Sequence, residues 1–281
     1  MRYFIVDAFT TKPFGGNPAG MVLIDNAGFP GEKLMQQIAA EFRYSETAFV
    51  KQNGHREFTV RYFTPSGEVD LCGHATIATF GVLLRENIVG PHSLCINHTL
   101  AGDLKVKVDG KVMMQTAKPT IIETPIDHHS LHQIMGAAPD EPRDFTSQIV
   151  STGLPDIMMP VGSVDQLNAL RPDMDALAKF CRQMNVTGVH AFALGDDGHT
   201  AHVRNFAPLV GIPEESATGT ANAALTHYLR CHGRLTPDAQ CSFRQGEAMG
   251  RPSVVTTRID PNGDIWVGGN SITIARGQLM L

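Results

Sequence analysis

Two glycines, Gly73 and Gly219, each stand directly before an alanine-rich, helix-like stretch and beside side chains that could bind an anion. A glycine before a helix lets backbone N–H groups approach a ligand without a Cβ in the way, and the helix N-terminus carries a partial positive charge. His74 and Thr220 add side-chain donors at matching places. The pattern predicts two sites for a substrate carboxylate, although ordinary helix capping would need the same residues.

Two further residues have both a chemical and a structural interpretation. Cys72, directly before Gly73, is either a small packed residue or a reactive thiol, and the packed interpretation is the commoner one. Asn17, in the loop GGNPAG, could donate to a substrate, but asparagine before proline is equally a turn former. Both residues therefore stay candidates.

Three histidines lie close together at the start of a helix-like segment, but they do not make a convincing metal site. Only Asp127 adds a potential ligand to His128, His129 and His132, so a solvated helix start is the favoured interpretation. No P-loop is present, and no GxGxxG follows a strand. We therefore expect neither a metal nor a cofactor.

The composition describes an ordinary, mildly acidic globular chain of 281 residues, with 42% hydrophobic residues, 18% charged residues and a net charge of −5. This charge makes nucleic acid and anionic membranes poor candidate partners. The opening MRYFIVDAFT is strand-like and no apolar run approaches the ~20 residues of a membrane span, so we expect a cytoplasmic protein. Five cysteines without a CxxC pair predict reduced thiols.

Periodicity places these motifs on a framework of strands with inserted helices. The predicted helices are residues 31–42 and 74–85, and the predicted strands include 3–9, 21–23, 47–50, 57–63 and 103–115. Few polar residues interrupt 74–85, which indicates a helix enclosed on most sides.

The second half of the chain repeats the first. VRYFTP, which begins at Val60, recurs as VRNFAP from Val203, and Ala48-Phe49 recurs at the same shift of 143 residues. The Gly73 motif recurs at Gly219 after a three-residue insertion. The economical explanation is duplication of one α+β unit, with a boundary in the proline-spaced stretch 117–125. We expect domains at 1–118 and 119–281, with a C-terminal strand, 270–281, that could join the first.

Several sequence runs together resemble the PhzF-like phenazine-biosynthesis family over nearly the whole chain. They are VDAFTTKPFGGNPAG, SETAFV, RYFTPSGEVDLCGHAT, STGLP and FAPLVGIPEESATGTAN. The resemblance implies a diaminopimelate-epimerase-like fold, in which each of two similar domains wraps a mixed β-sheet or barrel around a central helix. It also implies an active site in a cleft between the domains and a homodimer.

The resemblance also implies roles for particular residues. Glu46, in SETAFV, matches the family's general acid/base, which moves a hydrogen within a carboxylated ring substrate, and His74 supports it. The family's Asp-Pro-Ala-Thr-Gly-Ser run matches residues 215–220, ESATGT, so Glu215 is a longer acid and Thr220 a bulkier alcohol than the family pattern has. These replacements leave the identity of the substrate open.

We therefore expect a cofactor-independent isomerase that transfers a proton at carbon of a small carboxylated substrate, with cyclic acids among the candidates. The expected catalytic residues are Glu46, His74 and Glu215, and the expected substrate-binding residues are Asn17, Gly73, Gly219 and Thr220.

Two alternatives remain open at the level of sequence. Epimerases of this fold use two opposed cysteines, whereas here the two positions hold Cys72 and Thr218, which argues against two-base racemisation. A single-cysteine epimerase or dehydratase that uses Cys72 is still conceivable. A small-molecule binding protein without turnover is the other alternative.

Overall fold

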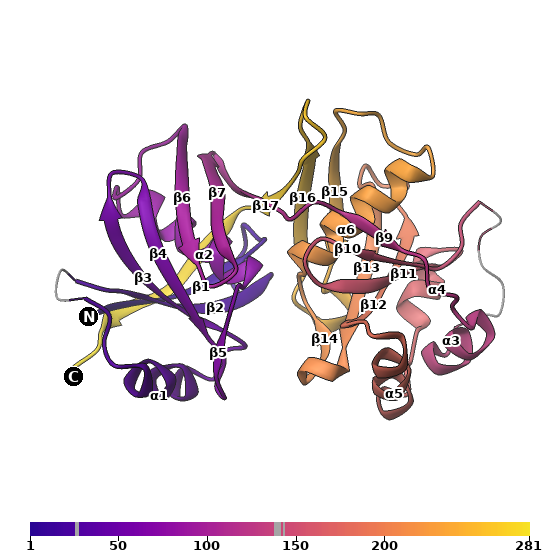
Figure 1. The fold of residues 1–281 in the computed structure, drawn as a ribbon, viewed down its shortest axis with the longest axis horizontal. Coiled ribbons are helices and arrows are strands. Elements are labelled where there is room, and N and C mark those ends of the chain that lie inside the picture. Colours follow the sequence, from indigo (N-terminus) through magenta and orange to yellow (C-terminus); the bar gives the residue numbers. More distant parts are fainter. Residues whose placement is uncertain (26–27, 138–141, 143) are drawn as a thin grey trace. The chain divides into compact units, whose positions relative to one another are not determined.

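Extended segments make up most of the first unit of the chain, and helices are more frequent in the second (Figure 1). The structure, a computed structural model, describes residues 1–25, 28–137, 142 and 144–281. Residues 1–115 with 268–281 form the first unit, and residues 116–267 form the second. Both units mix strands and helices, so the predicted α+β class is confirmed.

The first unit contains two helices, α1 and α2, among its strands. Its elements are β1 (Arg2–Ala8), β2 (Asn17–Leu23), α1 (Glu32–Phe42), β3 (Thr47–Gly54), β4 (Glu57–Phe63), β5 (Glu68–Val69), α2 (Gly73–Arg85), β6 (Ser93–Thr99), β7 (Gly102–Asp109), β8 (Lys111–Gln115) and β18 (Ser271–Gln278).

The second unit contains the helices α3 to α6 and two short 3-10 turns. Its elements are β9 (Thr120–Ile122), α3 (His128–Met135), β10 (Gln148–Ser151), β11 (Pro155–Pro160), α4 (Val164–Ala169), α5 (Met174–Met184), β12 (Gly188–Leu194), β13 (Ala201–Ala207), η1 (Pro208–Val210), β14 (Ile212–Glu215), α6 (Gly219–Cys231), β15 (Gln240–Gln245), η2 (Glu247–Met249) and β16 (Ser253–Ile259). The strand β17 (Ile265–Gly269) runs across the boundary with the first unit.

The two units pair their strands in the same order and with the same polarity. In the first unit, β1–β2 is antiparallel, β2–β3 parallel, β3–β4 antiparallel, β4–β6 parallel and β6–β7 antiparallel. In the second, β10–β11, β11–β12, β12–β13, β13–β15 and β15–β16 follow the same alternation. A shared order of five pairings supports the duplication that the repeated sequence motifs indicate.

An arginine–glutamate pair occurs at the same place in both units. Arg61 of β4 donates two hydrogen bonds to Glu68 of β5, at 2.7 and 2.5 Å, and Arg204 of β13 donates two to Glu214 of β14, both at 2.8 Å. Such two-point contacts fix geometry as well as charge. The arginine of each repeated motif therefore holds the short strand that precedes the central helix.

The central helix of the first unit, α2, is buried on nearly every side, from His74 to Leu83. It packs against β1, β2, β3, β7, β8 and β18, as its apolar sequence predicts. Gly81 allows a close contact with β18, because a Cβ there would lie 2.0 Å from Ser271 Oγ and the serine side chain would have to move. In the second unit, α6 packs against β10, β11 and β16.

The strand β18 completes the first unit although it follows the second in the sequence. It pairs antiparallel with β1 from Arg2–Gln278 to Ala8–Ser271. Arg85 of α2 also donates to the Ser271 carbonyl oxygen at 2.7 Å. The sheet of the first unit therefore uses residues from both ends of the described chain.

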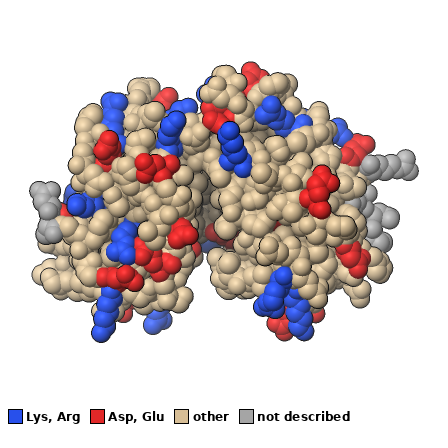
Figure 2. Space-filling view, viewed as in Figure 1, with Lys and Arg blue, Asp and Glu red and all other residues tan. Residues whose placement is uncertain are grey.

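On the face drawn in Figure 2, Lys and Arg side chains alternate with Asp and Glu over both units, without a large patch of one sign. This mixed distribution fits the mildly acidic composition, with its net charge of −5. None of the described helices is long and apolar enough to cross a membrane.

Candidate active site

Glu46, Cys72 and His74 meet at the N-terminus of α2. His74 Nε2 lies 3.3 Å from Glu46 Oε2, and the Cys72 sulfur lies 3.4 Å from His74 Nδ1. The His74 side chain is 4% exposed and that of Glu46 14% exposed. The histidine thus lies between a carboxylate and a thiol, with one ring nitrogen toward each.

Strand pairing places Glu46 beside this helix. Glu46 directly precedes β3, and its backbone carbonyl accepts a hydrogen bond from Gly20 of β2 at 3.1 Å. A Cβ on Gly20 would lie 2.7 Å from both the Thr47 hydroxyl and the Phe42 ring. A residue without a side chain at position 20 therefore lets β2 pair closely with the segment that carries the carboxylate.

A chain of three buried hydrogen bonds holds the backbone of Cys72. Asn97 donates to the Tyr62 hydroxyl at 3.0 Å, the Tyr62 hydroxyl lies 2.7 Å from that of Thr76, and Thr76 donates to the Cys72 carbonyl at 2.7 Å. One direction of donation satisfies all three contacts. Burial raises the pKa of Tyr62, so its hydroxyl keeps the proton that the chain needs.

No side chain caps the first turn of α2, because Cys72 makes no capping bond. The amides at the start of a helix have no partner within the helix, and they are aligned with its positive end. Gly73 and His74 occupy this turn, as the sequence predicts. An anionic group beside His74 would meet both the imidazole and this partial positive charge.

The corresponding turn of the second unit carries a different set of contacts. Thr218, which precedes α6, donates its hydroxyl to Glu215 Oε2 at 2.7 Å. Gln245 of β15 donates to the Glu215 carbonyl at 2.8 Å and accepts from the Thr218 amide at 3.0 Å. Thr218 is therefore held as a structural hydroxyl, while Gly219 and Thr220 form the first turn of the helix.

Asp156 of β11 is a buried carboxyl of the second unit that the sequence motifs do not reveal. Its side chain is 3% exposed, and its Oδ1 has no hydrogen-bond partner. Burial, and to a smaller extent the nearby Glu215, raise its pKa, a hydrogen bond from the Gly188 backbone opposes the rise, and the net pKa is about 7. Asp156 and Glu215 are thus two interacting acids in one region of the second unit.

The structure also locates the remaining candidates. Asn17 is buried and begins β2, whereas the sequence places it within a loop. The segment from His128 begins α3, as expected, with Asp127 accepting from the Ser130 amide at 3.1 Å. His132 differs from the expected solvated residue, because it faces the core of the second unit and is buried.

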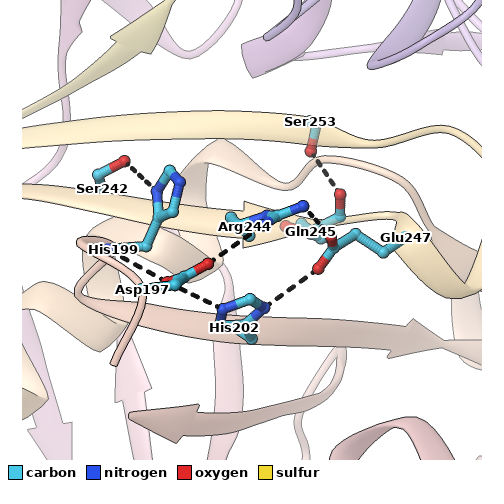
Figure 3. A network of polar contacts seen from close by, with 8 residues as sticks. All are labelled: Asp197, His199, His202, Ser242, Arg244, Gln245, Glu247 and Ser253. Atoms are coloured by element: carbon cyan, nitrogen blue, oxygen red, sulfur yellow. Dashed lines mark hydrogen bonds and ion pairs between the residues drawn. The ribbon is translucent and has the colours of Figure 1, made fainter. Parts of the chain in front are cut away.

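A polar cluster of the second unit, absent from the sequence-based expectations, joins β13, β15 and η2 (Figure 3). His202 lies between two carboxylates, 3.2 Å from Asp197 and 3.1 Å from Glu247, and Arg244 contacts both acids. Partial desolvation acts to raise the pKa of Asp197, but hydrogen bonds from Arg244 and His202 outweigh it and lower the pKa to about 2. Because these four side chains contact one another in a closed ring, we infer that the cluster stabilises the packing of this part of the second unit.

Comparisons with known proteins agree on one family. A family model described as phenazine biosynthesis-like protein matches residues 6–277. An uncharacterized isomerase of Clostridium acetobutylicum is 35% identical, over 98% of this chain and 97% of the relative. The crystal structure of a PhzF-family phenazine biosynthesis protein from Bacillus anthracis matches with a TM-score of 0.89 and 25% identity, over 100% of this chain and 99% of that one.

A more distant structure supports the fold alone. A probable proline racemase from Agrobacterium radiobacter, with bound carbonate, matches with a TM-score of 0.67 and 14% identity, over 100% of this chain and 93% of that one. The epimerase-like fold that the sequence resemblance implies is confirmed, and so is an isomerase as the class of enzyme. The chain belongs to the PhzC-PhzF family of phenazine biosynthesis-like proteins.

Proposed function

We propose that this isomerase transfers a proton at carbon of a small carboxylated substrate, with Glu46 as the general acid/base. One observation carries the proposal: Glu46 Oε2 is buried, accepts no hydrogen bond, and lies 3.3 Å from His74 Nε2 at the N-terminus of α2. A carboxylate oxygen that accepts no hydrogen bond can accept a proton from a substrate carbon.

In the forward step, the Glu46 carboxylate takes a proton from a carbon next to an electron-withdrawing group of the substrate. The C–H electron pair passes into that group as negative charge. His74 and the first-turn amides of α2 lie where they can bind this charge. The same carboxyl group then returns the proton to another carbon, so the composition of the substrate does not change.

The second unit contributes binding in this proposal. Gly219 and Thr220, at the start of α6, offer backbone amides and a hydroxyl to a substrate carboxylate. Glu215 accepts a hydrogen bond from the Thr218 hydroxyl and so holds the residue that precedes this turn. Asn17 adds a further donor. That one substrate molecule binds at both helix N-termini stays a prediction.

The thiol alternative has a specific observation in its favour. The Cys72 sulfur is 3.4 Å from His74 Nδ1, which is the contact that an imidazole needs to take a thiol proton. Cys72 could then act as the base of an epimerase or dehydratase. Nothing comparable exists at Thr218, whose hydroxyl is committed to Glu215.

The test is deuterium incorporation from D2O into a panel of cyclic and unsaturated carboxylic acids, followed by mass spectrometry. We expect the wild type to label at least one acid and Glu46→Gln to be slower by about 100-fold or more, the usual scale of a lost acid/base group. Glu41→Gln is the matched control, because Glu41 is an exposed carboxylate of α1 nearby in the sequence.

Other outcomes separate the alternatives. Equal labelling by wild type and Glu46→Gln would remove Glu46 as the base. Loss of labelling in Cys72→Ser with retention in Glu46→Gln would establish the thiol mechanism. Substrate binding by calorimetry without any labelling would indicate a binding protein that has no turnover.

Three further expectations accompany the proposal and stay predictions. The chain is expected to need no cofactor, to form a homodimer and to reside in the cytoplasm. Activity after exhaustive dialysis, sedimentation velocity and cell fractionation test them in turn.

A further inference from the structure

The three side chains at the start of α2 form a set of possible metal ligands. Within the part of the chain that the structure describes, Glu46, Cys72 and His74 are the one such group of three, and one ligand atom of each lies within 4.8 Å of the others. Two of the three residues are buried and Glu46 is partly buried. The group combines a carboxylate oxygen, a thiol sulfur and an imidazole nitrogen.

This donor set and its spacing suit Zn²⁺. With bonds of about 2.0–2.2 Å to nitrogen and oxygen and about 2.3 Å to sulfur, ligand atoms of a tetrahedral zinc site lie about 3.3–3.7 Å apart. His74 Nε2 and Glu46 Oε2 are already 3.3 Å apart, and the Cys72 sulfur is 3.8 Å from Nε2. Two ligands are thus in place and the third is close.

One adjustment is needed to bring the thiol to the ion. The sulfur is closest to His74 Nδ1, at 3.4 Å, and a single ion can bind only one ring nitrogen. The Cys72 side chain would have to rotate toward Nε2 to bind the same ion. The Ser45 hydroxyl, 3.3 Å from Nε2, gives up that contact in the process.

The Glu46 oxygen that accepts no hydrogen bond favours the binding of a cation. Apart from its ion pair with His74, Glu46 Oε2 is buried without a hydrogen bond. A buried carboxylate oxygen without a donor costs free energy, which coordination to a cation offsets. Sulfur and imidazole ligands select zinc over magnesium or calcium.

We propose that Zn²⁺ binds to Glu46, Cys72 and His74 as a reversible inhibitor, with a fourth position open to water. Binding forms a Zn–S bond and releases the thiol proton to solvent. It also occupies the carboxylate that moves the substrate proton, so the inhibitory effect rests on the function proposed above, whereas binding does not.

Co²⁺ is the probe, because a thiolate–cobalt bond gives a charge-transfer absorption band in the near ultraviolet. Zn²⁺ that replaces the cobalt ion removes this band. We expect one equivalent of Co²⁺ to produce the band in the purified, reduced, full-length protein. Cys72→Ser should abolish the band. Glu46→Gln should keep the sulfur ligand but weaken binding by at least about 100-fold, since loss of even an outer-shell partner costs about 10- to 100-fold.

Cys231→Ser is the matched control. Cys231 is exposed, and its sulfur lies 3.6 Å from His227 Nε2, so it is the other described thiol beside a histidine. The band should survive this substitution. A band that disappears with Cys231→Ser, or persists in Cys72→Ser, would overturn the assignment, as would the absence of any band in the wild type.

The deuterium-exchange assay supplies the second readout. Zn²⁺ should inhibit wild-type exchange, a chelator should restore it, and the half-inhibitory zinc concentration should rise at least about 100-fold in Cys72→Ser. Equal zinc sensitivity of the two proteins would refute inhibition through this site. If no protein exchanges deuterium, the proposed function fails, and the cobalt spectra still decide the metal site.

Discussion

Asp156→Asn is the substitution whose effect on stability the structure defines most sharply. Asp156 is buried, its Oδ1 lacks a partner, and a Gly188 backbone amide donates to its carboxyl group. A carboxamide has nearly the same shape, keeps an acceptor for Gly188, and never ionises. The substitution therefore removes the charge and little else.

The direction of the effect depends on pH. Burial, with Glu215 nearby, raises the pKa of Asp156 from 3.8 to about 7, so the folded chain holds this proton more tightly than the unfolded chain. Its contribution to stability is complete below about pH 3.8 and is lost as the pH rises through about 7. The difference between the two pKa values corresponds to about 4 kcal/mol at most.

Asp156→Asn should thus be more stable than the wild type by up to about 4 kcal/mol near pH 8, and nearly equal to it near pH 4. Burial lowers the pKa of His190 to about 3, which destabilises the folded wild type as the pH falls below 6.5. Both proteins share this term, so it cancels when their free energies of unfolding are subtracted.

The assay is urea unfolding at several pH values, followed by the fluorescence of Trp266. Trp266 is the single tryptophan, is buried, and lies in the same unit as Asp156, so its signal reports that unit. Asp175→Asn, an exposed aspartate of α5, is the control and should show no pH-dependent gain. A difference between wild type and Asp156→Asn that stays constant with pH would refute the reasoning.

Three other substitutions probe the scaffold of the site. Gly20→Ala places a Cβ 2.7 Å from the Thr47 hydroxyl, so thermal unfolding should show a loss of about 1–3 kcal/mol and the deuterium exchange should slow. Gln245→Leu leaves the Thr218 amide without its acceptor, and urea unfolding should show a loss of about 1–3 kcal/mol, with unchanged stability contradicting the hydrogen-bond assignment. Tyr62→Phe interrupts the hydrogen bonds beneath Cys72, and should cost about 1–2 kcal/mol by the same measurement while leaving α2 formed in circular dichroism.

Local patterns predicted elements that surround the candidate active site. The strand predicted at 57–63 is β4, and the helix predicted at 74–85 is α2, which begins one residue earlier at Gly73. Both segments have strong signals, namely strand-forming residues in one and a continuous apolar run in the other. The repeated motifs also fall on equivalent strands, β4 and β13, because equivalent positions meet equivalent neighbours.

Contacts between distant segments could not be predicted in the same way. Gln245 reaches Thr218 across 27 residues, and Asn97 reaches Tyr62 across 35, so neither pair has a signature in local spacing. The burial of Asp156 depends on the strands around it, although an aspartate directly after STGLP in a strand of apolar residues was a signal available in the sequence. The carboxylate–imidazole contact of Glu46 and His74 likewise needs the pairing of β2 with β3.

The pairing of β18 with β1 has a consequence for the order in which the protein is made. A ribosome releases β1 first, but β18 follows the whole second unit, so the second unit can fold while the sheet of the first still lacks a strand. Until then, the edge of β1 and the surface of α2 around Gly81 are exposed to solvent and to other nascent chains. The sheet of the unit that carries Glu46 and His74 is thus completed by a strand that is synthesised after the second unit.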